Sequence, residues 1–278
     1  MTWTVDKGIQ CQNLVAQIET RLTGSGWTEI DSTNKVFRTT TNQGATAILQ
    51  VGQAGTYQYI YLQGWYSWLA GSGLNGSPGQ YCQIYFASAA QAGTVTVDLY
   101  MSVTANRVII FIDGVGLYAN WGYFGGLDSL AASNDHGAVV ITAAAMPGYS
   151  ATSAYILLGT VSGWWGNANL CTVAVIGNSM GGGVLGQNGP TSFSALANAL
   201  MSSDGGKALG FPVLVVDSGG PRGNLDGLLY CPLGTVYDRQ TFVVAGVTYL
   251  MVVPRGEPAN LGHPLTGNFY QALLIPQV

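Results

Sequence analysis

The residues of this chain that could do chemistry begin with a serine in a Gly-x-Ser-x-Gly motif. Residues 177–181, GNSMG, follow an apolar run typical of a buried strand. At this spacing a sharp strand-to-helix turn can expose the serine hydroxyl. Asp217 and His263 follow in the chain order that such serine hydrolases use. A hydrolase would use Ser179 as nucleophile, His263 as general base and Asp217 to orient the imidazole.

The sequence after Ser179 argues against catalysis. Each glycine of residues 181–183 disfavours a helix by about 1 kcal/mol relative to Ala, and that helix would help to stabilise an oxyanion. The alternating strand–helix order of an α/β-hydrolase is missing from residues 1–160. We therefore expect Ser179 to lie in a Gly-rich loop without His263 within hydrogen-bonding reach, and the chain to have no catalytic residue. A serine hydrolase that uses GNSMG is the alternative.

The cysteines and acidic residues do not form a metal-binding pattern. Cys11, Cys82, Cys171 and Cys231 are isolated, without the paired spacing of zinc sites, and we expect them to be small buried hydrophobic residues. The segment 128–135 carries two aspartates without EF-hand spacing, as a solvated turn would. The sequence predicts neither a metal site nor a cofactor.

A run of aromatic residues could bind a ligand by stacking. Tyr57, Tyr59 and Tyr61 alternate with other residues, so on a strand they would share one face. Such rings can stack on nucleic-acid bases or bind a sugar, but packing in a core or at a protein interface is the use we favour. The interface candidates are Tyr57, Tyr59, Tyr61, Trp65, Trp68, Trp121, Trp164 and Trp165.

The elements that would position these residues are mainly strands. Apolar residues at helical spacing predict the clearest helix over residues 6–23, and residues 192–203 are a candidate for a short second helix. Residues 95–103 and 107–113 are strand-like and separated by a short turn, which predicts a hairpin. The Gly- and aromatic-rich segment 114–135 is expected to be a structured loop. Further strands are expected at 36–41, 45–51, 56–69, 81–87, 171–177, 213–218, 241–253 with a break at Gly246, and 269–275. Residues 138–145 and 155–161 are further apolar runs.

Together these elements predict an α+β fold, in which the N-terminal helix packs on a mostly antiparallel β body with Gly-rich loops. Residues 1–113 would hold the helix and an antiparallel β region. Residues 114–278 would form a second β-rich, Gly-rich region, and a single domain spanning both is the alternative.

Charge is scarce in this chain. Its 278 residues include 9 Lys and Arg and 13 Asp and Glu, against 40 glycines. A typical soluble domain has about 25 % charged residues, and charge helps to keep copies of a protein apart. We therefore expect a subunit that is buried against copies of itself or against other partners.

The same composition excludes several classes of partner. The basic residues are scattered singly and the net charge is −4, so no basic face for direct nucleic-acid binding is expected. No apolar run is long enough to span a bilayer. The N-terminus lacks the pattern of a secretory signal, which predicts synthesis in a cytosol.

Three segments together carry a resemblance. The first is the N-terminal helix with the turn 24–28 and the strands after it. The second is 98–114, DLYMSVTANRVIIFIDG, followed by the aromatic, Gly-rich stretch 118–127. The third joins the Leu-Asp-Gly segment 224–230 to 246–253, GVTYLMVV. In this order the segments resemble a family of tailed-bacteriophage virion proteins that is also found in prophage-derived particles.

The resemblance implies a structural subunit of a phage tail, neck or baseplate, without catalysis. Its partners would be copies of itself and other virion proteins, and its location the virion, assembled in the cytoplasm of the bacterial host. Residues 138–200 do not match the family pattern. A carbohydrate- or cell-surface-binding tail module that uses the Tyr/Trp strand is a further alternative.

Overall fold

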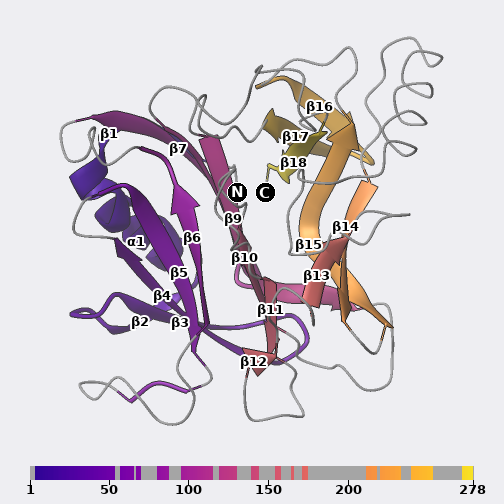
Figure 1. Cartoon of the computed structure of the whole chain (residues 1–278), viewed down its shortest axis with the longest axis horizontal. Helices are drawn as coiled ribbons and strands as arrows, with labels where there is room; N and C mark the ends of the chain where they lie inside the picture. Colours follow the sequence, from indigo (N-terminus) through magenta and orange to yellow (C-terminus); the bar gives the residue numbers. More distant parts are fainter. Residues whose placement is uncertain are drawn as a thin grey trace.

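The chain folds almost entirely as antiparallel β-strands in two sheets, with one α-helix among the described residues (Figure 1). The expected α+β fold is therefore wrong, since the long N-terminal helix shrinks to ten residues. That helix is also too short to cross a membrane, and no other described helix could do so. The computed structural model describes residues 4–53, 57–65, 67–69, 80–87, 95–114, 119–129, 139–143, 154–157, 164–165, 171–174, 211–217, 220–232, 239–252 and 271–277.

The smaller sheet has five antiparallel strands and two unlike faces. Side chains alternate between the faces of a strand, so Leu49, Leu62 and Ile84 are buried on one face. The other face carries polar and aromatic side chains such as Tyr61 and Gln83. The strands, in spatial order, are β2 (Thr28–Asp31), β3 (Val36–Thr40), β4 (Thr46–Gln53), β5 (Tyr59–Trp65) and β6 (Gln80–Tyr85).

The larger sheet has 13 strands. They are β1 (Thr4–Gln10), β7 (Thr96–Val103), β8 (Arg107–Asp113), β9 (Ala119–Ser129), β10 (Val139–Ala143), β11 (Ala154–Leu157), β12 (Trp164–Trp165), β13 (Cys171–Ala174), β14 (Phe211–Asp217), β15 (Gly220–Pro232), β16 (Thr241–Val244), β17 (Val247–Val252) and β18 (Gln271–Pro276). The main path runs β1-β7-β8-β9-β15-β18-β17-β16. β9 pairs with β8 along most of its length and with β15 at its end. The sheet therefore curls into a half-barrel, with β15 to β18 opposite β7 to β9 (Figure 1).

The two sheets pack face to face around the main hydrophobic core. The helix α1 (Leu14–Thr23) lies at one end of this sandwich and buries Leu14, Ile18 and Leu22 completely. These side chains join residues of both sheets, among them Leu62 of β5 and Ile110 of β8, in one cluster. Each fully buried aliphatic side chain contributes roughly 1.5–3 kcal/mol relative to an exposed one, so this core is the main source of stability.

The curled half of the larger sheet covers the other face of β7 to β9. Phe111 and Trp121 are cross-strand partners on β8 and β9, and both are fully buried. Arg239, just before β16, places its guanidinium 5.0 Å from the Tyr100 ring centre and 4.7 Å from that of Phe111, and it pairs with the Asp113 carboxylate. The fold therefore has three layers, with the strands β7 to β9 in the middle.

The first half of the helix predicted over residues 6–23 is instead the edge strand β1, and a short 3-10 turn joins it to α1. Gly8 has a φ of 65°, a conformation that only glycine adopts freely. Its N–H donates to the Asp98 carboxylate at 2.9 Å, and the β1–β7 register shifts between Asp6 and Ile9. The apolar spacing suggested a helix because Ile9 contacts the same core as the helix does.

The hairpin predicted at 95–103 and 107–113 is confirmed, since β7 and β8 pair antiparallel with Val103 opposite Val108. The break predicted at Gly246 is also confirmed. Ala245 and Gly246 have φ of 50° and 82° between β16 and β17, as a tight hairpin turn requires.

The loop predicted over 114–135 is wrong in its middle, because residues 119–129 form the strand β9. Its glycines permit close approach. A Cβ on Gly122 would lie 2.5 Å from Ile84 of the other sheet, and a Cβ on Gly125 would lie 2.5 Å from the Arg107 Cα. β8 and β9 also pair across position 114, so one sheet spans the two regions that were expected to meet there.

Candidate functional site

The three residues of the alternative serine-hydrolase hypothesis lie mostly outside the described part of the chain. Ser179 and His263 lie outside the described residues, as do the side chain of Asp217 and those of Trp164 and Trp165. The backbone of Asp217 ends β14 and pairs with β13 and β15. That Ser179 is not a nucleophile therefore stays a prediction.

Metal ligands do not cluster within the described residues, where no group of three His, Cys, Asp or Glu could hold an ion. Cys11 and Cys82 are free thiols and are buried, as expected for small hydrophobic residues. Burial raises the pKa of the Cys11 thiol, which keeps it protonated and unreactive. The side chains of Cys171 and Cys231 lie outside the description.

The outer face of the five-stranded sheet is the candidate site. Strand pairing sets Gln50 opposite Gln63, Tyr61 opposite Gln83, and Tyr59 opposite Tyr85. Cross-strand partners lie on the same face, so β4, β5 and β6 present these six side chains together. We call Gln50, Tyr59, Tyr61, Gln63, Gln83 and Tyr85 the tyrosine–glutamine face.

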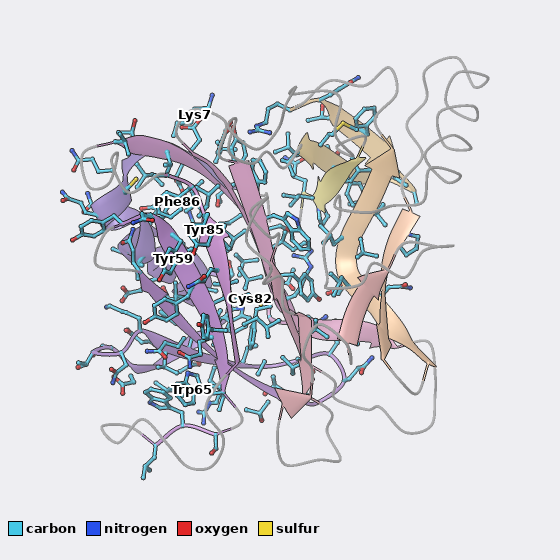
Figure 2. The ribbon with its side chains drawn as sticks, in the orientation of Figure 1. Lys7, Tyr59, Trp65, Cys82, Tyr85 and Phe86 are labelled. Atoms are coloured by element: carbon cyan, nitrogen blue, oxygen red, sulfur yellow. The ribbon has the colours of Figure 1, made fainter. Side chains whose placement is uncertain are left out.

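The tyrosines of this face are held in defined positions. A Cβ on Gly52 would lie 1.9 Å from Tyr61 Cζ, so the Tyr61 ring lies across the backbone of β4. The rings of Tyr59 and Tyr85 are 4.8 Å apart and tilted by 46°, and Figure 2 shows them side by side on the sheet. Aromatic pairs at this separation attract each other. The tyrosines therefore form an ordered surface.

The same face continues into a small apolar cluster at the other end of β5, near Trp65 (Figure 2). Trp65 and Trp68 pack edge to face at 4.9 Å beside Val36 and Ile48. The Trp65 indole N–H donates to the Gln50 side-chain oxygen at 3.1 Å, and the Trp68 indole N–H donates to the Asp31 carboxylate at 3.2 Å. This cluster anchors one end of the tyrosine–glutamine face.

Two of the predicted interface residues lie elsewhere. Trp121 is fully buried inside the curled sheet. Tyr57 precedes β5 with a φ of 54° and packs against the main core, so it does not share the face of Tyr59 and Tyr61. The strict alternation expected for the three tyrosines fails because the regular strand begins only at Tyr59.

A buried polar cluster surrounds Arg107, and no sequence motif indicates it. Its guanidinium is 2 % exposed and donates to the Ser102 carbonyl and hydroxyl, both at 3.0 Å. Its Nε lies 3.7 Å from the Asp226 carboxylate. That carboxylate also accepts a 2.6 Å hydrogen bond from the Asn106 side chain. The turn of the predicted hairpin and the Leu-Asp-Gly segment thus meet in space.

Burial dominates the electrostatics of this cluster. Burial lowers the pKa of Arg107, against the charge of Asp226 and other acidic groups, and it raises the pKa of Tyr123, which is fully buried nearby. The Tyr123 hydroxyl donates to the Gly126 carbonyl and accepts from the Asp226 N–H at 3.1 Å. Apart from the Arg107 Nε, which has the Asp226 carboxylate only at 3.7 Å, these groups bond one another and Arg107 and Tyr123 are buried, which suits a structural cluster better than a catalytic one.

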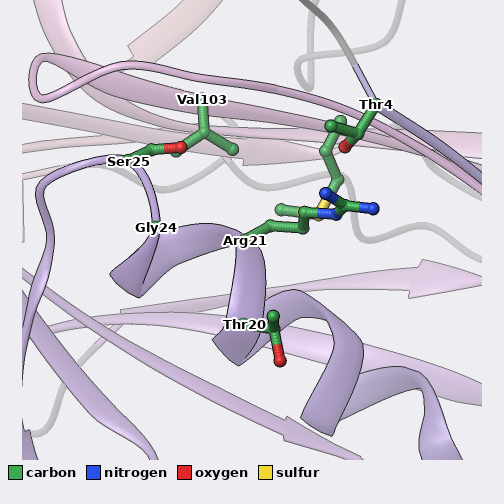
Figure 3. Close-up of a pocket in the computed structure, with 7 residues that line it drawn as sticks. Thr4, Thr20, Arg21, Gly24, Ser25 and Val103 are labelled. Carbon is green, nitrogen blue, oxygen red and sulfur yellow. The ribbon is translucent and has the colours of Figure 1, made fainter.

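A hollow of about 210 Å³ lies between α1 and the strands β1 and β7 (Figure 3). Thr4, Arg21, Ser25 and Met101 are among its lining residues. The Arg21 guanidinium is held by a bidentate pair with the Asp6 carboxylate, so its charge is already neutralised. This hollow offers no free charged group to a ligand.

Comparison with known proteins does not assign this chain to a family. A scan against models of known protein families finds no match, and no curated protein sequence matches the chain.

Proposed function

We propose that this chain is a non-enzymatic structural subunit of a bacteriophage or phage-like particle, in the tail, neck or baseplate. It acts through contacts with copies of itself and with other virion proteins. The order of the virion-like sequence segments and the low charge motivate this proposal. The observation that carries it is the unprotected sheet edge at β16.

The strand β16 ends the larger sheet with apolar side chains in the open. Val243 is 70 % exposed and Val247, across the hairpin, is 38 % exposed. Within the described residues β16 pairs only with β17, and its four residues carry no charge. An exposed apolar edge is a template for another strand.

The opposite edge of the same sheet, β1, is charged and irregular, unlike β16. β1 carries Asp6 and Lys7 and is interrupted by the irregularity around Gly8, features that protect an edge from pairing. An unprotected edge at one end of a sheet and a protected one at the other suits a subunit that joins its neighbours in one defined way.

The described charges are largely used within the chain. Ion pairs join Arg21 to Asp6, Lys35 to Glu19, Arg107 to Asp226 and Arg239 to Asp113. Internally paired charges provide little repulsion between copies, so close contact between subunits meets a low electrostatic barrier.

The β16 edge can be tested with a single added charge. We expect Val243→Lys to lower the mass of the assemblies that the purified protein forms, because a lysine on an edge strand opposes pairing. Thr46→Lys, at an exposed position of β4, adds the same charge away from this edge and should leave the assemblies unchanged. Light scattering coupled to size-exclusion chromatography measures both masses.

Equal masses for wild type, Val243→Lys and Thr46→Lys would contradict assembly through β16. Labelling of Ser179 by a fluorophosphonate probe would contradict the non-enzymatic role, since only an activated serine reacts with such a probe.

A further inference from the structure

We propose that the tyrosine–glutamine face of the five-stranded sheet binds a neutral polysaccharide. This inference goes beyond the proposed structural role, and it rests on a different sheet from the β16 edge. It is carried by the ordered tyrosine rings, the amide groups between them and the lack of charge on the strands that present them.

The tyrosine rings supply flat π surfaces that are fixed before a ligand arrives. Tyr61 lies across Gly52, where a Cβ would overlap its ring, so the backbone of β4 supports one side of the ring. Tyr59 and Tyr85 hold each other at 4.8 Å. The face of an aromatic ring is electron-rich, and the C–H groups of a pyranose, polarised by the neighbouring oxygens, can pack on it.

Amide and hydroxyl groups alternate with these rings. The Gln83 side-chain oxygen accepts from the Tyr85 hydroxyl at 3.1 Å, which fixes the amide and directs its NH₂ group away from that bond. Within the described residues no hydrogen bond uses the Gln83 amide nitrogen or the Tyr61 hydroxyl. A side-chain amide and a phenol can each bond a sugar hydroxyl.

The strands β4, β5 and β6 contain no Asp, Glu, Lys or Arg. Arg38 of β3 is opposite Ile48 on the same side of the sheet, away from the paired tyrosines of β5 and β6. An anionic glycan would find no cation among the six residues of the face, and a cationic one no carboxylate. The lack of charge on the face therefore favours a neutral glycan over a charged one.

The composition of the face also favours a glycan over a second protein copy. The core of a protein–protein interface combines aliphatic and aromatic side chains with Met and Arg. The six residues that define the tyrosine–glutamine face include three tyrosines, but none is aliphatic, Met or Arg. The aliphatic residues Val36 and Ile48 on this side of the sheet are already covered by the tryptophan cluster.

The test is retention of the full-length protein on immobilised amylose, cellulose and chitin, with heparin as a charged comparison. We expect retention on at least one neutral polysaccharide and none on heparin. Tyr61→Ala should weaken that retention by about tenfold or more, as expected for the loss of one stacking ring. Tyr61→Phe keeps the ring and should retain most of the binding.

Gly52→Ala tests the position of the Tyr61 ring on the tyrosine–glutamine face without removing any side chain that could touch the sugar. The added methyl group displaces the Tyr61 ring, so binding should fall in the same direction as with Tyr61→Ala. The matched variant Thr46→Ala, on the same strand, should bind as the wild type does. Circular dichroism shows whether each variant is folded, and Gln83→Ala replaces Tyr61→Ala if the latter is not.

Three outcomes would overturn the inference: no retention on any of the neutral polysaccharides, equal retention of folded wild type, Gly52→Ala and the tested face variant, or stronger retention on heparin. Dissociation of an oligomer by Tyr61→Ala would also overturn it, because the face would then be a contact between copies. Loss of β16-mediated assembly would leave the glycan inference standing, so the two proposals fail separately.

Discussion

At the residue scale, the buried Arg107 guanidinium is the group that most needs a compensating charge and hydrogen-bond acceptors around it. It is almost inaccessible to solvent, and its Nε has no hydrogen-bond partner, only the Asp226 carboxylate at 3.7 Å. Removing one partner of a buried ion pair leaves an uncompensated charge, which costs more than the pair contributes when intact. The cluster around Arg107 therefore fixes how β8, β9 and β15 meet.

Asp226→Ala tests this role. We expect the free energy of unfolding to fall by about 3 kcal/mol, because Arg107 loses its opposite charge and Asn106 loses its hydrogen-bond acceptor. The surface pair of Lys35 and Glu19 gives the comparison, since Lys35→Ala should cost less than about 1 kcal/mol. Urea unfolding at one fixed protein concentration measures both. Equal losses would show that the Arg107 cluster contributes no more to the free energy of unfolding than a surface ion pair does.

Asp128 gives a pH dependence of known sign. Partial burial and the charge of Asp226 raise the pKa of Asp128 above its ordinary value of 3.8, although Arg107 opposes the shift. The folded state thus holds this proton more tightly than the unfolded state, and the contribution of Asp128 to stability falls as pH rises from 3.8 through the folded pKa.

Asp128→Asn should therefore stabilise the protein at neutral pH, by less than about 1 kcal/mol because the carboxylate is exposed. The gain should vanish at pH values below 3.8, where the wild-type residue is protonated in both states. Thermal melts across this range check the prediction, and a gain that persists in acid would rule out the electrostatic cause.

At the element scale, β1 depends on a glycine in a left-handed conformation. Gly8→Ala should lower the free energy of unfolding by about 1 kcal/mol, because an L side chain is disfavoured at positive φ. Gly8→Asn should cost less, since Asn tolerates this conformation. A melting comparison of the two variants measures the difference, and a neutral Gly8→Ala would mean that the edge strand is free to rearrange.

The elements that could be predicted from the sequence are those fixed by neighbouring residues. The β7–β8 hairpin and the β16–β17 turn at Gly246 depend on local strand patterns and turn residues. β9 could not be predicted, because its glycines are required by close contacts with Ile84 and Arg107, which are distant in the sequence. Residues 6–10 of β1 have the apolar spacing of a helix because Ile9 packs against the same core as α1.

The candidate site could be predicted only in part. The alternation of Tyr59 and Tyr61 placed them correctly on one face. Their assembly with Gln50, Gln83 and Tyr85 needs the register of three strands, which the sequence does not reveal. Asn106 and Asp226 are 120 positions apart, so nothing local indicates that they touch.

At the scale of the whole molecule, the composition and the exposed sheet edge both favour association between copies. Charged residues make up 8 % of the chain, several of them are paired internally, and the larger sheet ends in an exposed apolar strand. Such a surface favours association over a dispersed monomer. The proposed structural role makes this association the working state of the protein.

The central claim is best tested by the mass and form of the wild-type protein in solution. Sedimentation velocity over a range of concentrations, with negative-stain electron microscopy of the same samples, measures both. We predict a discrete assembly of several copies, visible as rings, tubes or stacked subunits. A protein that stays monomeric at high concentration and low salt, with no assemblies in the micrographs, would contradict the proposal that this chain is a structural subunit.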